Sequence, residues 1–147
     1  GPGAGGGGVR MQRLHKELRA LPGQLLQHPS SSVWVVYDPD RPQFLRAAIT
    51  GPATTPYEGG VFVFDVYCPP QYPHVPPRVS FLTTAGGTVR FSPNLYADGK
   101  VCLSLLGTFE GPGWNPSSSI FAVLVSIQGM ILGVTHPLLN EPGFGGF

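Results

Sequence analysis

The sequence predicts one α+β domain: an N-terminal helix, a four-stranded antiparallel meander, an irregular segment and a buried helix that crosses the sheet. Apolar residues recur at helical spacing near both ends of the chain. Short runs of β-branched and aromatic residues lie between these two stretches. The connections between consecutive runs are short, which favours an antiparallel meander over parallel strands joined by crossover helices.

The first helix is predicted over residues 9–21, where a narrow apolar stripe recurs at helical spacing. Its members are Met11, Leu14, Leu18 and Leu21, and the basic residues around it are Arg10, Arg13, Lys16 and Arg19. The pattern alone favours a solvated face over a binding face for the basic residues. Pro22-Gly23 is predicted to end the helix. Residues 1–8 are expected to form a flexible Gly-rich lead before a domain at 9–147.

The four strands are predicted at residues 33–37, 44–50, 61–68 and 78–83. In the third run, alternation places the side chains of Phe62, Phe64, Val66 and Cys68 on one face. Cys68 is therefore expected to pack as a small hydrophobic residue in the core.

Residues 69–77 contain five prolines, so this segment is neither a helix nor a central strand. A proline-rich ligand for a recognition domain is one interpretation. The interleaved Tyr72 and Val75, together with the flanking strands, favour a rigid, packed loop. Residues 84–108 show no clear period, and long irregular segments inside compact domains are often functional.

The second helix is predicted over residues 120–132, which are apolar almost all round, Met130 included. Ser117, Ser118 and Ser119 precede it and are good candidates for its N-cap. Because few polar groups interrupt this stretch, the helix is expected to be buried against the sheet.

Composition excludes several classes of protein. The chain has 21 Gly and 17 Pro, but 41% hydrophobic residues and no three-residue glycine period, which exclude a disordered or collagen-like chain. Nine Lys and Arg against eight Asp and Glu give a net charge of +1, too balanced for a nucleic-acid partner. No apolar window is long enough for a membrane span, so no membrane partner is expected. Two cysteines favour a reducing compartment, the cytoplasm or nucleus.

Most catalytic signatures are missing from the sequence. The histidines at 15, 28, 74 and 136 are scattered and none is at metal-ligand spacing with cysteine or a carboxylate. A phosphate loop, a nucleophile elbow and a close pair of carboxylates are also lacking. Cys102 follows an Asp98-Gly99 turn in the irregular segment, where a partner could reach its thiol. Free cysteines are usually buried and inert, so spacing alone leaves its role open.

Six segments of the chain form a recognisable series: Gly51-Pro52 to Gly59-Gly60, Tyr72-Pro73-His74-Val75-Pro76-Pro77, Ser92-Pro93-Asn94, Gly99-Lys100-Val101-Cys102-Leu103, Trp114-Asn115-Pro116 and residues 123–128. In this order they resemble a ubiquitin-conjugating enzyme, the carrier that holds ubiquitin as a thioester. Within that family, Leu105-Leu106-Gly107-Thr108 and Asn140-Glu141-Pro142-Gly143-Phe144 resemble the Z-type branch and the related large hybrid carriers.

The resemblance implies a mechanism and a set of site residues. Cys102 would take the modifier, ubiquitin or a ubiquitin-like protein, from an activating enzyme as a thioester. A substrate lysine or a ligase cysteine would then receive it. Asn94 would stabilise the oxyanion, hold the active-site loop, or both, and Glu141 would steer the incoming lysine. ATP is used by the activating enzyme, so no cofactor and no metal are expected in this chain.

The resemblance also implies partner contacts with the activating enzyme and a ligase at Arg13, Lys16, Pro73, His74 and Pro116. Two departures from the family pattern stand out. Ser92 occupies the position of the family's histidine, and the chain stops at Phe147 where the family continues with two further helices, so a C-terminally truncated domain is expected.

Two other functions remain as alternatives. A non-catalytic variant of the same fold would bind ubiquitin or a ligase as a scaffold, but such variants lack the cysteine that this chain has at Cys102. A cysteine hydrolase would need a supporting histidine, and the sequence around Cys102 carries no hydrolase signature.

Overall fold

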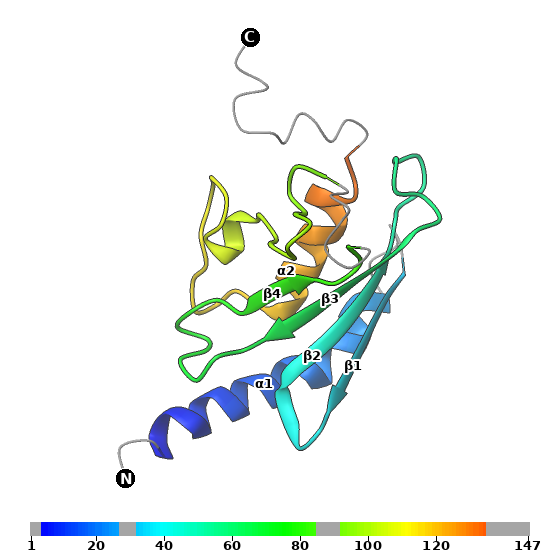
Figure 1. The fold of residues 1–147 in the computed structure, drawn as a ribbon. Coiled ribbons are helices and arrows are strands. Elements are labelled where there is room, and N and C mark those ends of the chain that lie inside the picture. Colours follow the sequence, from blue (N-terminus) through cyan, green and yellow to red (C-terminus); the bar gives the residue numbers. More distant parts are fainter. Residues whose placement is uncertain (1–3, 27–31, 85–91, 135–147) are drawn as a thin grey trace.

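The computed structural model describes residues 4–26, 32–84 and 92–134 (Figure 1). Its elements, in order, are α1 (Ala4–Leu26), β1 (Val33–Asp38), β2 (Arg41–Thr50), β3 (Val61–Tyr67), β4 (Arg78–Phe81), the 3-10 helix η1 (Ser104–Leu106), α2 (Ile120–Ser126) and the π-helical turn η2 (Ile127–Ile131). The sheet has the order β1-β2-β3-β4, and every neighbouring pair is antiparallel. The predicted α+β class and meander are confirmed.

One hydrophobic core lies between the sheet and the two helices, which cover the same face of the sheet (Figure 1). The alternation predicted for β3 is confirmed, because Phe62, Phe64 and Val66 are all buried on that face. The stripe of α1 and the apolar side of α2 complete the core with Leu14, Leu18, Leu21, Ile120, Val123 and Leu124. Cys68 is fully buried at the end of this row, as expected of a packed hydrophobic residue.

The bounds of α1 differ from the prediction at both ends. The helix begins at Ala4, so it includes glycines that were assigned to a flexible lead. Glycine lowers helix propensity without forbidding a helix, and a nucleated helix extends at low cost. At the other end the helix continues through Pro22 to Leu26. Pro22 is exposed, while Leu25 packs against the core one turn beyond Leu21, so tertiary packing offsets the lost hydrogen bond.

The crossover helix is present but is less uniformly buried than predicted. The cap is as predicted, since the Ser119 hydroxyl accepts a hydrogen bond from the Ala122 N–H at 3.1 Å. Met130 is 60% exposed, which contradicts its assignment to the buried surface. The reason is the π-helical turn at Ile127–Ile131, whose wider winding changes which residues face the sheet.

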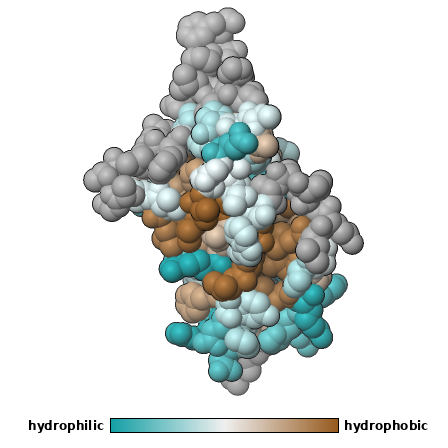
Figure 2. All heavy atoms as spheres, turned by 90° about the vertical axis from the view of Figure 1, so that its right-hand side faces the viewer, coloured by the Kyte–Doolittle hydropathy of each residue, from teal (hydrophilic) through white to brown (hydrophobic). Residues whose placement is uncertain are grey.

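The structure exposes hydrophobic side chains on one face, and its described residues include neither a membrane-spanning helix nor a cluster of metal ligands. The face that carries the β1 edge of the sheet shows a cluster of hydrophobic side chains (Figure 2), and β1 itself exposes Trp34 and Val36. No helix among the described residues is long and apolar enough to cross a membrane. In the part of the chain that the structure describes, no group of three or more potential metal ligands occurs.

Candidate active site

The segment before Cys102 is hydrogen-bonded to the outer edge of β4, the last strand of the sheet. Lys100 forms an isolated bridge with Ser80, and the Phe81 N–H donates to the Gly99 carbonyl at 2.8 Å. Gly99 has φ +96°, and a Cβ atom there would lie 3.1 Å from the Phe81 carbonyl oxygen. The Asp98 carboxylate accepts from the Lys100 N–H at 3.0 Å. The Asp98-Gly99 turn therefore lies close against β4, and this contact fixes the position of the segment that leads to Cys102.

Cys102 and Asn94 are joined by two hydrogen bonds. The Cys102 N–H donates to the Asn94 carbonyl at 2.8 Å, and Asn94 Nδ2 donates to the Cys102 carbonyl at 2.9 Å. Asn94 is 4% exposed, and its Oδ1 has no hydrogen-bond partner among the described residues. Of the two roles that the resemblance implied, this geometry displays the loop-holding one.

Ser92, which replaces the family's histidine, contributes to the same loop. It is buried, and its hydroxyl accepts a hydrogen bond from the Asn94 N–H at 3.0 Å. Local bonds of this kind, from a hydroxyl to the N–H two residues later, stabilise tight turns. The serine thus shapes the turn that delivers Asn94 to Cys102.

The two cysteines of the chain lie in different surroundings. Cys102 is 5% exposed, which is more covered than the sequence analysis expected of a reachable thiol. Cys68 is 0% exposed, and desolvation, followed by the nearby negative charge of Glu17, raises the pKa of its thiol to about 12. A thiol in that state is inert as a nucleophile at neutral pH. Cys68 is therefore a structural residue.

A groove of about 420 Å³ lies beside this segment and reaches Val101, the residue before Cys102. The proline-rich loop forms one wall, and Lys100, Arg78 and Thr108 also line it. No acidic side chain is among the described residues that line the groove. The approach to the segment is accordingly positive in charge.

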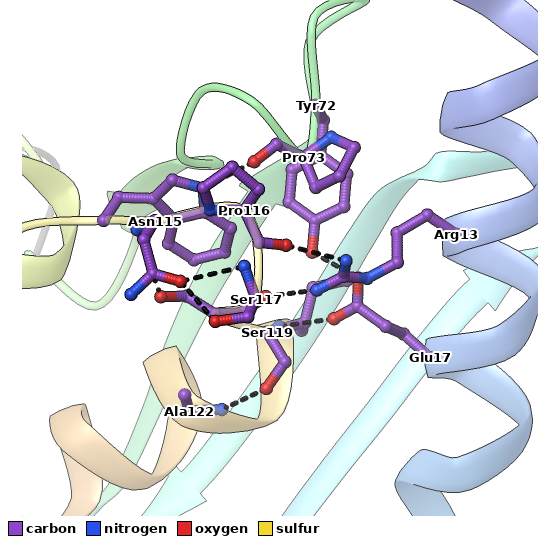
Figure 3. Close-up of polar contacts among 12 residues, drawn as sticks. Arg13, Glu17, Tyr72, Pro73, Asn115, Pro116, Ser117, Ser119 and Ala122 are labelled. Atoms are coloured by element: carbon purple, nitrogen blue, oxygen red, sulfur yellow. Dashed lines mark hydrogen bonds and ion pairs between the residues drawn. The ribbon is translucent and has the colours of Figure 1, made fainter.

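A second site lies where α1, the proline-rich loop and the segment before α2 meet, and we call it the docking corner (Figure 3). It comprises residues 13–17, 72–74 and 114–120. The Glu17 carboxylate lies at its centre. One oxygen accepts from the Ile120 N–H at 2.7 Å, and the other accepts from the Tyr72 hydroxyl and from Arg13 Nε. One side chain therefore joins three segments.

Arg13 strengthens the same junction. Its guanidinium donates to the Pro116 carbonyl at 2.8 Å and to the Ser118 carbonyl. Its Nε lies 3.0 Å from the Glu17 carboxylate. Arg13 was predicted to contact a partner; in the structure its guanidinium donates to groups within the chain, and the partner contact stays a prediction. Lys16, on the same helix, is exposed.

The remaining residues assigned to partner contact lie in the docking corner. The Trp114 indole N–H donates to the Pro73 carbonyl at 2.8 Å and so ties the two loops together. Pro73 itself is buried, whereas His74 and Pro116 are exposed. Burial and the hydrogen bond to Glu17 raise the pKa of the Tyr72 hydroxyl, which keeps it protonated. The structure thus brings the two loops together, with His74 and Pro116 exposed to solvent and Pro73 buried.

Glu141 lies outside the described residues, so its assignment stays a prediction. Glu17 is a central residue of this junction that sequence reasoning missed. The available signal was its spacing of four from Arg13, which is typical of an ion pair on one helix face. Its bonds to Tyr72 and Ile120 cross 55 and 103 residues and leave no local pattern.

Comparisons with known proteins agree with this arrangement. A family model described as ubiquitin-conjugating enzyme matches residues 13–142. The chain is 51% identical over 120 residues to the ubiquitin-conjugating enzyme E2 Z of Homo sapiens, which is 82% of this chain and 33% of that protein. It is 51% identical over 140 residues to the human dual E2 ubiquitin-conjugating enzyme/E3 ubiquitin-protein ligase BIRC6, which is 92% of this chain and 3% of that protein.

A solved structure gives the same result for the fold. The ubiquitin conjugating enzyme E2 UbcA1 from Agrocybe aegerita matches with a TM-score of 0.71 and 28% identity, over 88% of this chain and 86% of that one. The chain spans 19%, 38% and 36% of the length of three curated relatives that it matches. The matched relatives bear out the resemblance to Z-type and large hybrid carriers. By sequence and fold, this chain belongs to the ubiquitin-conjugating enzyme family.

Proposed function

We propose that this chain carries ubiquitin, or a ubiquitin-like modifier, as a thioester on Cys102. It accepts the modifier from an activating enzyme and passes it to a lysine of a substrate protein or to a cysteine of a ligase. The observation that carries the proposal is the pair of hydrogen bonds between Cys102 and Asn94. These are two residues that the family pattern names, eight positions apart, and both are buried.

The chemistry is an exchange of acyl groups. The Cys102 thiolate attacks the thioester carbonyl at the C-terminal glycine of the modifier, and the activating enzyme's cysteine leaves as a thiolate. In the second step a lysine amine attacks the new thioester and forms a C–N bond. The Cys102 thiolate then leaves, and the amine loses its proton to solvent or to a nearby base. ATP is consumed earlier, by the activating enzyme, so no cofactor takes part in either step.

Asn94 has two parts in this proposal. Its Nδ2 bond to the Cys102 carbonyl holds the loop in place, so the reacting carbon meets a thiol of fixed position. Its amide is also of the type that stabilises an oxyanion, and loss of such a donor typically costs ~10²–10³ in rate. Glu141, beyond the described residues, remains our candidate for steering the lysine amine.

The docking corner is our candidate surface for the activating enzyme and the ligase. Lys16, His74 and Pro116 are exposed there, and the Glu17 bonds hold the segments that present them in fixed relative positions. Both cysteines are free thiols, which suits a reducing compartment, and we place the protein in the cytoplasm or the nucleus on that ground.

A charging reaction tests the proposal. The chain is mixed with an activating enzyme, ATP and ubiquitin, and in parallel with ubiquitin-like modifiers and their activating enzymes. We expect an adduct that requires ATP and disappears on addition of a thiol reductant. A folded chain that forms no adduct with any of these modifiers would refute the carrier function.

A further inference from the structure

The backbone on both sides of Cys102 is held by one side chain, that of Thr108. The Thr108 hydroxyl oxygen accepts a hydrogen bond from the Leu103 N–H at 3.0 Å. The same hydroxyl donates to the Val101 carbonyl at 2.7 Å. These two groups belong to the residues directly before and after Cys102, so a single hydroxyl spans the cysteine.

The chain is folded so that Thr108 returns to this point. Residues Ser104–Leu106 form the 3-10 helix η1, and the Leu106 N–H donates to the Leu103 carbonyl at 3.0 Å. Gly107 then adopts φ +72°, a left-handed conformation in which glycine is favoured. The reversal brings Thr108 back beside Leu103. In the sequence, Gly107-Thr108 served only to indicate the family resemblance. In the structure, Gly107 reverses the chain and Thr108 binds the backbone beside Cys102.

Thr108 and Asn94 divide the backbone around the thiol between them. Asn94 binds the N–H and the carbonyl of Cys102 itself. Thr108 binds the Val101 carbonyl and the Leu103 N–H. The two peptide groups on either side of the Cys102 Cα are therefore each bound at both the carbonyl and the N–H, by the Thr108 hydroxyl and by the backbone carbonyl and side-chain amide of Asn94. These four hydrogen bonds fix the direction of the Cys102 Cα–Cβ bond.

We infer that Thr108 is a positioning residue for Cys102: its hydroxyl holds the flanking peptides so that the thiol faces the incoming thioester. The inference rests on the proposed function, since Cys102 is a nucleophile only there. Thr108 is exposed and lines the groove beside Val101. Its contribution lies in these hydrogen bonds rather than in core packing, which makes it separable from the fold.

Valine and serine substitutions separate the hydroxyl from the shape of the side chain. Thr108→Val keeps the shape and removes the hydroxyl, whereas Thr108→Ser keeps the hydroxyl. Thr50→Val is the matched control, because the Thr50 hydroxyl also accepts a backbone N–H, from Ser32 at 2.9 Å, at the far end of β2. If Thr108→Val disturbs the fold, Thr108→Ala replaces it as the variant that lacks the hydroxyl.

The first measurement is the rate of charging as a function of activating-enzyme concentration, followed by discharge to free lysine. We expect Thr108→Val to lower kcat and the discharge rate about 10-fold, because small misplacements of a reacting group are costly, with KM within about twofold. Thr108→Ser and Thr50→Val should stay within about twofold of the unmodified chain. A charging rate for Thr108→Val equal to that of the unmodified chain, or a Thr108→Ser variant as slow as valine, would overturn the inference.

The second measurement needs no partner. The rate at which iodoacetamide alkylates Cys102 in the folded chain is compared between variants by mass spectrometry, and the protection of the buried Cys68 thiol shows that each variant stays folded. A changed Cys102 rate in Thr108→Val, but not in Thr50→Val, supports the positioning role even if the unmodified chain fails to charge. An unchanged rate contradicts it. The failure of the carrier function and the failure of this inference are thus read separately.

Discussion

The reactive segment and the docking corner are held by different kinds of contact. Around Cys102, two neutral side chains, Asn94 and Thr108, bind backbone groups close by in the sequence. In the docking corner, the Glu17 carboxylate binds Tyr72, which is 55 residues further along the chain, and Ile120, which is 103 residues further along. The contacts around Cys102 fix the backbone that carries its thiol. The contacts of Glu17 fix the relative positions of α1, the proline-rich loop and the start of α2. Substitutions around Cys102 should therefore act on rates, and substitutions in the docking corner on stability and partner binding.

The largest effect on stability is expected from Glu17→Ala. It leaves the Arg13 guanidinium, the Tyr72 hydroxyl and the Ile120 N–H without their shared acceptor. Removal of one partner from a largely buried, hydrogen-bonded charge network costs about 3–5 kcal/mol. Denaturant unfolding measures this loss. The comparable removal of Asp65, which pairs with Arg46 on the exposed sheet face, should destabilise the chain far less, because water screens that ion pair.

If Glu17→Ala and Asp65→Ala destabilise the chain equally, the docking corner is not the charge-centred junction that we describe. Glu17→Gln refines the test, because it keeps an acceptor but removes the charge. We expect it to raise the KM for the activating enzyme more than it lowers kcat, since Glu17 touches no reacting atom.

The largest effect on chemistry after loss of the thiol itself is expected from Asn94→Ala. It removes the donor to the Cys102 carbonyl, and the rate of discharge to free lysine should fall by ~10²–10³. Single-turnover discharge of the preformed thioester measures it. A fall of less than about threefold in a folded variant would mean that Asn94 neither stabilises the oxyanion nor positions the loop.

A smaller effect is expected from reversing the charge of Lys16. Lys16→Glu should slow charging about 3- to 10-fold at low salt, because an exposed charge at the rim of an interface acts mainly on the association rate. The difference should shrink at high salt. Arg41→Glu, a matched charge reversal on the β1–β2 hairpin, is the control. Equal slowing in both variants would indicate an effect of net charge. Lys16 would then be part of a solvated helix face and not of a binding surface.

The smallest effect is expected at Cys68. Since its pKa is raised to about 12, the thiol should resist alkylation at pH 8 in the folded chain and react once the chain is unfolded. An unfolded cysteine has a pKa near ~8.5, so the contribution of this group to stability is full below that pH and is lost as pH rises toward about 12. Rapid alkylation of Cys68 in the folded chain at pH 8 would contradict the burial.

The difference between the two regions also explains what the sequence could predict. Strand alternation, the Asp98-Gly99 turn and the serine cap of α2 follow from local patterns, and the structure has all of them. The Asn94–Cys102 pairing was implied by the family resemblance, and the structure joins the two residues by hydrogen bonds. The contacts of Glu17 depend on how α1 packs, which no local pattern contains.

The errors have the same physical origin. Pro22 was predicted to end α1, but the helix continues to Leu26, because Leu21 is buried and Leu25 packs against the core. Met130 was predicted to be buried, but the π-helical turn exposes it. The bonds of Arg13 to Pro116 and Ser118 were also not foreseen, because they cross more than 100 residues, while its partner contact stays a prediction. In each case tertiary packing decides the outcome, and the sequence carries only the local preference.

The central claim is that Cys102, and not Cys68, carries the modifier. The most direct test is to charge Cys102→Ala and Cys68→Ala side by side with the unmodified chain, using activating enzyme, ATP and ubiquitin. We predict that a reductant-sensitive adduct forms on the unmodified chain and on Cys68→Ala and is lost in Cys102→Ala. An adduct that persists in a folded Cys102→Ala variant, or that disappears in a folded Cys68→Ala variant, would contradict the account.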